Sequence, residues 1–181
     1  MMHTDIGVLG QIGLLLAYPR GDYGDRLELC RNALPLGDTE AESLLGSFVR
    51  QIQSLPLEKM QELYTYTFDL NPVCALEVGW QLHGEEYGRG EFLVAMRKQL
   101  RLHCIPESRE LPDHLSCVLS LRDRMEPEEA RNFTEASLLP ALNKMLAGFP
   151  ERSNPYRNLL LAIAKLLSSD PGEGLPEAPH V

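Results

Sequence analysis

Apolar residues recur three and four positions apart along most of this 181-residue chain, which is the spacing of one buried face of an α-helix. A clear example is the stripe of Leu45, Phe48, Ile52 and Leu55, which follows a Thr39-Glu-Ala-Glu42 sequence typical of a capping box. No segment shows the strict two-residue alternation of a half-buried strand. The pattern therefore predicts an all-α fold, with a single domain of about nine helices.

Prolines, glycines and capping residues divide the stripes into separate helices. The expected helices cover approximately residues 8–16, 23–34, 39–55, 57–68, 71–80, 90–104, 112–122, 127–148 and 155–167. Pro140 predicts a kink or a restart in the eighth of these. The last segment has three prolines, three acidic residues and no Lys or Arg. We therefore expect a helical domain over 1–167 and a disordered acidic tail over 168–181.

The charge balance narrows the choice of partner. The chain has 17 Lys and Arg against 26 Asp and Glu, a net charge of −9, whereas nucleic-acid binding needs a dense basic face. The longest apolar run, residues 12–18, is far shorter than the roughly 20 residues that span a bilayer. The residues before it lack the Lys or Arg of a signal peptide. These features predict a cytoplasmic protein without membrane insertion, whose scattered cysteines are free thiols.

Common catalytic motifs are absent: there is no GxxxxGK[ST], GxGxxG, HExxH or GxSxG sequence. One group of residues has side chains that zinc accepts, namely His103, Cys104, His114 and Cys117. Two of them are three positions apart on an expected helix, but paired CxxC spacing is missing. Packed thiols and a histidine at a helix end are the simpler interpretation. A helical metal-binding protein or enzyme that uses these four residues is the alternative.

The segment from Tyr64 to Pro72 carries more information. Tyr64 and Phe68 share one helix face, and Asp69 lies beside the expected helix end. A carboxylate there is mildly unfavourable against the helix dipole. The segment is therefore either a core stripe with a capping aspartate or a stripe beside a functional carboxylate.

A second informative segment is Glu110-Leu-Pro-Asp-His-Leu115. Pro112 in the first turn of the expected helix would place Asp113 at the positive end of that helix. His114 is expected to titrate near neutrality and so to act as a switch or a hydrogen-bond donor. A helix start with favourable charge placement is the competing interpretation.

Together the two segments, Phe-Asp-Leu-Asn-Pro at 68–72 and Glu-Leu-Pro-Asp-His-Leu at 110–115, resemble the NarJ-type nitrate reductase delta subunit family. These are assembly chaperones of molybdenum enzymes, related to TorD and DmsD. The similarity extends from Leu9 to about Leu167 and includes the Trp80-Gln-Leu-His-Gly84 stretch. Ser116 departs from the family, which often has proline there.

The resemblance implies a TorD/NarJ-like chaperone fold, with no catalytic activity and no cofactor. The implied partner is the N-terminal segment of the catalytic subunit precursor of a molybdenum oxidoreductase, nitrate reductase or a relative, held until its cofactors are inserted. The implied state is a monomer or a dimer that exchanges helices. A basic amphipathic client helix in an acidic-edged groove would give the net charge a role. The residues implied to bind the client peptide are Tyr64, Phe68, Asp69, Trp80, His83, Glu110, Pro112, Asp113 and His114.

Overall fold

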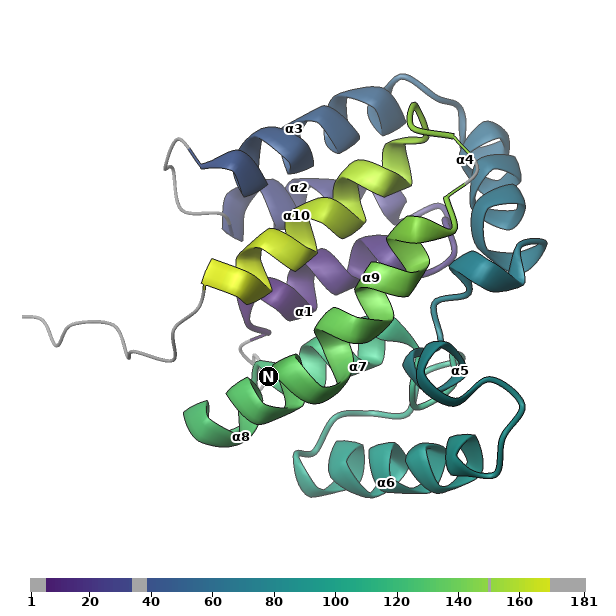
Figure 1. The fold of residues 1–181 in the computed structure, drawn as a ribbon. Coiled ribbons are helices and arrows are strands. Elements are labelled where there is room, and N and C mark those ends of the chain that lie inside the picture. Colours follow the sequence, from purple (N-terminus) through teal and green to yellow (C-terminus); the bar gives the residue numbers. More distant parts are fainter. Residues whose placement is uncertain (1–5, 34–38, 150, 170–181) are drawn as a thin grey trace, which may run out of the picture.

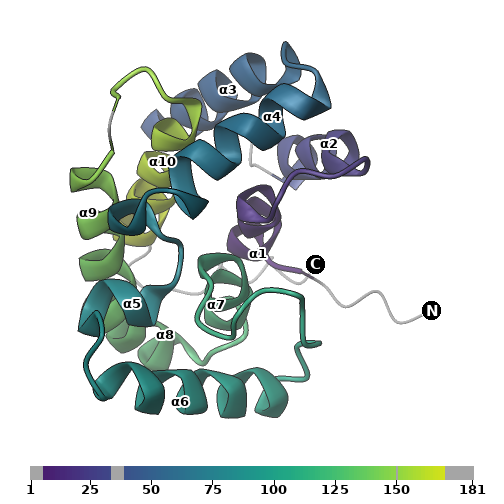
Figure 2. The same ribbon diagram turned by 90° about the vertical axis from the view of Figure 1, so that its right-hand side faces the viewer.

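The computed structural model describes residues 6–33, 39–149 and 151–169, and every regular element in these ranges is helical (Figures 1 and 2). Joined by a π-helical turn, α8 (Pro127–Phe133) and α9 (Leu139–Ala147) count as one interrupted helix, which gives nine α-helical segments in this part of the chain. The predicted all-α fold is confirmed. The α-helices are α1 (Val8–Gly13), α2 (Tyr23–Ala33), α3 (Glu40–Gln53), α4 (Leu57–Tyr64), α5 (Val78–His83), α6 (Gly88–Leu102), α7 (Leu115–Arg122), α8 (Pro127–Phe133), α9 (Leu139–Ala147) and α10 (Pro155–Ser169).

Local capping signals set several of these boundaries. The Thr39 side chain accepts a hydrogen bond from the Glu42 amide, and the Glu42 carboxylate accepts one from the Thr39 amide, both at 3.3 Å. This is the predicted capping box of α3. At the start of α10, Oδ1 of Asn154 accepts from the Tyr156 amide at 3.0 Å. Both starts therefore follow from residues within three positions of the helix end.

The core lies between α10 and α3 on one side and between α1 and α7 on the other (Figure 1). Fully buried side chains from each helix meet there, including Ile12, Phe48, Leu119 and Ile163. Helix α6 packs against α5 and α7 at the opposite end of the molecule from α3 (Figure 2), and its Met96 and Leu100 belong to the same apolar cluster.

The expected helix over 71–80 is wrong. Pro72–Cys74 forms only one turn of 3₁₀ helix, and α5 begins at Val78. Between them the backbone is extended and pairs with the segment before α7. The Val78 amide donates to the Asp113 carbonyl, and the Leu115 amide donates to the Leu76 carbonyl, both at 2.8 Å. This isolated antiparallel bridge between Glu77 and His114 competes with helix formation, so it divides the segment.

The seventh helix begins at Leu115, three residues later than expected from Pro112, because His114 caps it. The eighth helix is interrupted as expected. A π-helical turn over Thr134–Leu138 precedes α9, whose second residue is Pro140. Proline has no N–H to donate to the carbonyl four residues earlier, which explains the local change of pitch.

At the end of the chain α10 continues to Ser169, two residues beyond the expected domain boundary. The rest of the predicted tail, 170–181, lies outside the described residues. Within the described ranges no helix is both long and apolar enough to cross a bilayer. All four cysteines are free: Cys30 and Cys74 are buried, Cys104 is exposed, and Cys117 is intermediate.

Candidate functional site

The two informative sequence segments meet at a hollow of about 360 Å³. We call it the interhelical groove. It lies between the π-helical turn that follows α4, the extended strand before α5, the first turn of α6 and the loop before α7. Six of the nine predicted client-binding residues line it. Its lining residues are Tyr64, Phe68, Asp69, Pro72, Ala75, Leu76, Glu77, Trp80, Arg89, Glu110 and His114.

Tyr64 and Phe68 form the floor of the interhelical groove. Each is only 4% exposed, and their ring centres are 5.1 Å apart in an edge-on arrangement. Both rings also pack against Tyr156, at 5.9 and 5.0 Å. The Tyr64 hydroxyl donates to the Leu16 carbonyl at 2.9 Å. Most of the surface of these two aromatic rings therefore belongs to the core, which agrees with the interpretation of Tyr64 and Phe68 as a core stripe.

Trp80 and Arg89 form one wall. The indole N–H of Trp80 donates to the Pro72 carbonyl at 2.9 Å, which fixes the ring against the 3₁₀ turn. The Arg89 guanidinium lies 5.2 Å from the indole ring centre, within the range of a cation–π interaction. This wall thus offers both an aromatic surface and a positive charge.

Carboxylates surround the opening. Asp69 is exposed, whereas Glu77 and Glu110 are half-buried. Burial raises the pKa of Glu77, the neighbouring Asp113 raises it further, and Arg89 opposes the shift. With three carboxylates and one guanidinium along its lining, the interhelical groove favours a cationic ligand with an apolar part.

Asp113 does not line the groove. Its carboxylate is buried, and Oδ2 accepts a hydrogen bond from the Gly79 amide at 3.0 Å in the first turn of α5. Burial raises its pKa, and the bond from Gly79 opposes that shift. The carboxylate does lie at the positive end of a helix, but that helix is α5 and not the one that follows Pro112. Asp113 therefore holds α5 against the 110–115 segment.

The expectation that His114 titrates near neutrality is wrong. The side chain is 2% exposed, and burial lowers its pKa to about 4. Its Nδ1 lies 2.7 Å from the Ser116 hydroxyl and accepts from the Ser116 amide at 3.3 Å. His114 therefore stays neutral at physiological pH and serves as the N-cap of α7.

The other two predicted residues lie elsewhere. The His83 ring packs against Phe92 of α6, with ring centres 5.9 Å apart. Pro112 lines a separate hollow beside α6, together with Leu111 and Val94. The structure therefore does not bring His83 and Pro112 to the interhelical groove.

Glu77 and Arg89 are members of the groove that the sequence did not single out. Glu77 lies in the extended segment before α5. The helical spacing of neighbouring apolar residues predicts a helix there instead. Arg89 belongs to the first turn of α6, and no local pattern connects it with Trp80. The pairing of residues 77 and 114 brings the extended segment beside the loop before α7, and the contact with Trp80 brings in Arg89.

The alternative metal site is not assembled. Among the described residues, which include all four of its candidates, no three His, Cys, Asp or Glu side chains are placed to hold a metal ion. The Cys117 thiol contacts the Ser108 hydroxyl at 3.3 Å, while Cys104 is exposed in a left-handed turn after α6. The described structure therefore does not bring these four side chains together as a metal centre.

Comparison with solved structures identifies the class of fold. The chain is similar to a redox enzyme maturation protein from Archaeoglobus fulgidus, with a TM-score of 0.62 and 22% sequence identity. The similarity covers 88% of this chain and 91% of that one. It shows that the two share an all-α fold. No protein-family model matches the sequence.

Curated relatives identify the type more closely. The chain is 29% identical over 137 residues to the nitrate reductase molybdenum cofactor assembly chaperone NarJ of Escherichia coli K12. It covers 56% of that protein, and the match takes in 75% of this chain. A Bacillus subtilis NarJ is 24% identical over 160 residues, which is 87% of this chain and 86% of the relative. The resemblance to NarJ-type chaperones is confirmed, and none of these relatives is named as a catalyst.

Proposed function

We propose that this chain is a cytoplasmic assembly chaperone that binds the N-terminal segment of the catalytic subunit of a molybdenum oxidoreductase, nitrate reductase or a relative. Such a protein holds its client until cofactor insertion is complete and needs no catalytic group of its own. The relatives named for molybdenum cofactor assembly support the type of client. The observation that carries the proposed site is the interhelical groove, where five predicted residues of the two distant segments lie together with Trp80.

The groove suits a segment of an amphipathic helix. Trp80 and the edges of Tyr64 and Phe68 supply apolar contact, and helix-in-groove binding uses such anchors. Asp69 and Glu110 at the opening would pair with Lys or Arg of the client. The net charge of −9 would raise the rate of association with a basic segment. Affinity would then come from the aromatic anchors, and orientation from the charges.

Calorimetric titration of the full chain with a synthetic peptide of the N-terminal segment of a nitrate reductase catalytic subunit tests this proposal. We expect saturable binding that weakens as salt rises, and a weaker affinity for Asp69→Ala. The matched control is Glu62→Ala, which removes an exposed carboxylate of α4 that lies outside the groove. Equal effects of the two substitutions would show that the peptide responds only to bulk charge.

A second experiment tests the function in the cell. Deleting the gene should leave the molybdenum oxidoreductase of the same organism without its cofactor, and plasmid-borne wild-type protein should restore it. A deletion strain whose oxidoreductase is fully loaded and active would refute the assembly role.

A further inference from the structure

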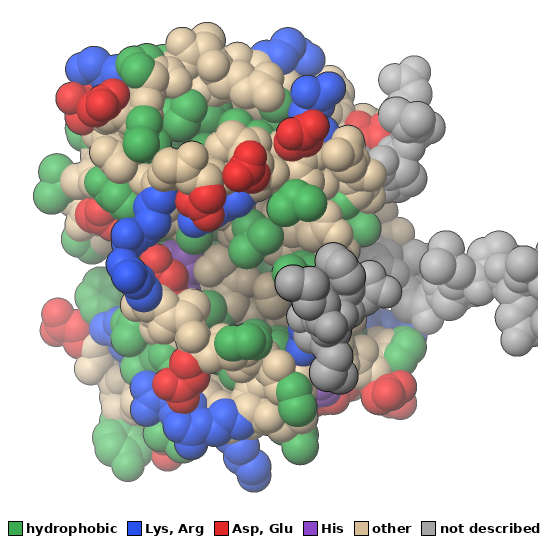
Figure 3. Space-filling view, turned by 180° about the vertical axis from the view of Figure 1, so that it is seen from behind, with side chains coloured by type: hydrophobic (Ala, Val, Ile, Leu, Met, Phe, Trp, Pro, Cys, Tyr) green, Lys and Arg blue, Asp and Glu red, His purple; other side chains and the backbone are tan. Residues whose placement is uncertain are grey.

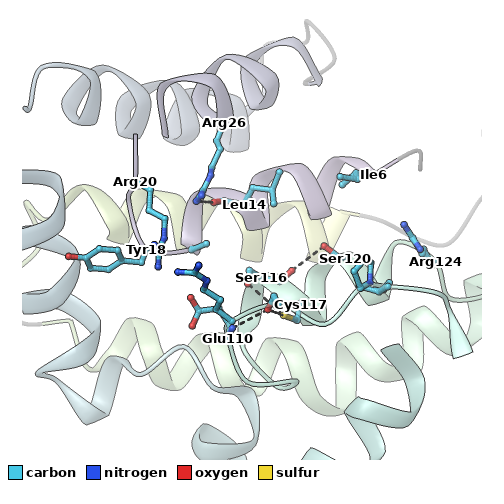
Figure 4. A pocket seen from close by; sticks show the side chains of 16 residues that line it. Ile6, Leu14, Tyr18, Arg20, Arg26, Glu110, Ser116, Cys117, Ser120 and Arg124 are labelled. Carbon is cyan, nitrogen blue, oxygen red and sulfur yellow. Dashed lines mark hydrogen bonds between the residues drawn. The ribbon is translucent and has the colours of Figure 1, made fainter. Parts of the chain in front are cut away.

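A larger cavity of about 520 Å³ lies beside the interhelical groove, between α1, α2, the loop over 104–110 and α7. Apolar and small polar side chains make up its interior, and the Cys117 thiol is among them. The close-up shows Arg20 and Arg26 reaching into it from the α1 and α2 side, with Glu110 facing them (Figure 4). Seen from behind, this side of the molecule has a hollow bordered by charged side chains of both signs (Figure 3).

The charge of this cavity is opposite to that of the protein as a whole. Four arginines and a single acid line it, and we call it the arginine cavity: Arg20, Arg26, Arg109 and Arg124, with Glu110. A concentration of positive charge in a chain of net charge −9 favours an anionic ligand at this place.

Two of the four arginines already make polar contacts, and the Arg20 guanidinium lies 6.0 Å from the Tyr18 ring centre. Arg26 pairs with Asp22 at 3.0 Å, and Arg124 donates to the His103 carbonyl at 2.8 Å. Arg20 and Arg109 make no ion pair within the described part of the chain. Both are exposed at the mouth, so their guanidinium groups are available to a carboxylate, which Arg binds through two parallel hydrogen bonds.

The arginine cavity and the interhelical groove share a wall. Glu110 lines both of them. The Tyr18 ring of the cavity packs edge-on against the Tyr64 ring of the groove, with centres 5.4 Å apart. Ser116 of the cavity contacts His114 of the groove at 2.7 Å. The two hollows are therefore neighbours, and a segment bound in the groove would pass beside the cavity at Glu110.

We propose that the arginine cavity is a second subsite of the client site, in which Arg20 and Arg109 receive an acidic side chain of the bound segment. The inference rests on the proposed function and adds a requirement on the client. The client segment must carry basic residues for the groove and an acidic residue further along for the cavity. The basic and acidic residues then follow a fixed order along the client segment, and this order sets the direction in which the segment binds.

Synthetic amphipathic peptides test the inference with the full chain. The first has Lys at its N-terminal end and Glu at its C-terminal end, the second has the same residues in the opposite order, and each has a partner peptide with Gln in place of Glu. We expect one order to bind about tenfold more tightly than its Gln partner, the gain of one charge-assisted pair. Equal affinities of all four peptides would overturn the subsite.

The protein side of the experiment uses Arg20→Gln/Arg109→Gln. We expect this double variant to bind the preferred Glu peptide no better than its Gln partner. The matched control, Arg50→Gln/Arg97→Gln, removes the same charge from exposed positions outside both sites. A control that loses the preference equally would show that bulk charge, and not the cavity, recognises the acid.

Cys117 reports occupancy of the cavity independently. In a Cys104→Ser background, which removes the exposed thiol, alkylation of Cys117 should slow about tenfold when the preferred peptide is bound. An unchanged rate with the peptide bound would overturn the subsite and leave the proposed function intact. Failure of every peptide to bind would overturn both.

Discussion

Substitutions at Asp113 test whether its carboxylate stabilises the fold or contacts the client. The resemblance to the NarJ family implies that Asp113 contacts the client, yet its side chain is fully buried and accepts a hydrogen bond from the Gly79 amide. Asp113→Ala removes that acceptor and leaves a buried N–H without a partner in the first turn of α5. Asp113→Asn is the matched variant, because an amide oxygen can accept the same bond and carries no charge.

The expected cost follows from these contacts. Loss of a capping side chain costs about 1 kcal/mol, and an unsatisfied buried N–H about 1–3 kcal/mol. Relief of the buried charge offsets part of this, since burial dominates the raised pKa of Asp113. We expect a net loss of about 2 kcal/mol for Asp113→Ala, or about 4–8 °C in Tm for a domain of this size. Asp113→Asn should stay within about 0.5 kcal/mol of the wild type.

Urea unfolding at pH 7, with peptide titration below the transition, measures both effects. Asp113→Ala should lower the free energy of unfolding and leave the peptide affinity of the folded fraction nearly unchanged. An Ala variant with wild-type stability and no peptide binding would refute the capping role.

The pH dependence gives a further check on Asp113. Because the pKa is raised in the folded state, the folded protein binds the proton more tightly than the unfolded chain. The contribution of Asp113 to stability therefore falls as pH rises from the ordinary aspartate pKa to the raised one. The wild type should gain stability relative to Asp113→Asn as the pH falls through this window. A stability difference that does not change with pH would contradict the burial of this charge.

Three other predictions follow from the described contacts. With a pKa lowered to about 4, His114 should show no change in its NMR ring signals between pH 6 and 8, and stability should fall by up to about 3 kcal/mol as the pH drops from about 6.5 to 4. Tyr64→Phe removes the bond to the Leu16 carbonyl and should cost about 1 kcal/mol in urea unfolding; no loss would mean that water replaces the carbonyl. Asp69→Ala should weaken peptide binding about threefold to tenfold at low salt with Tm unchanged, because Asp69 is exposed; a drop in Tm would indicate a capping role.

The sequence predicts those features whose causes are local. The Thr39 capping box and the interruption before Pro140 depend on residues within a few positions of each other, so pattern analysis finds them. The partner of Asp113 is different, because Gly79 lies 34 positions earlier in the chain. No spacing rule connects such residues.

The candidate site shows the same division between local and distant causes. Tyr64 and Phe68 share a face by helical spacing, and they lie together in the groove as expected. Arg89 reaches the groove from another helix, and His114 owes its low pKa to burial, which depends on the whole fold. Helical spacing shows which residues share one face of a helix. Tertiary packing decides which helices meet and how much water reaches the residues between them.

The bridge between Glu77 and His114 has a consequence for how the groove can change the ligand that it prefers. Main-chain bonds at 2.8 Å hold the two walls of the groove at a fixed separation, and any residue except proline supplies a main-chain donor. Side chains at Glu77 and Glu110 can therefore be exchanged without moving the walls. Over evolution, a groove of this kind can change the ligand that it prefers by substitution at these two half-buried positions.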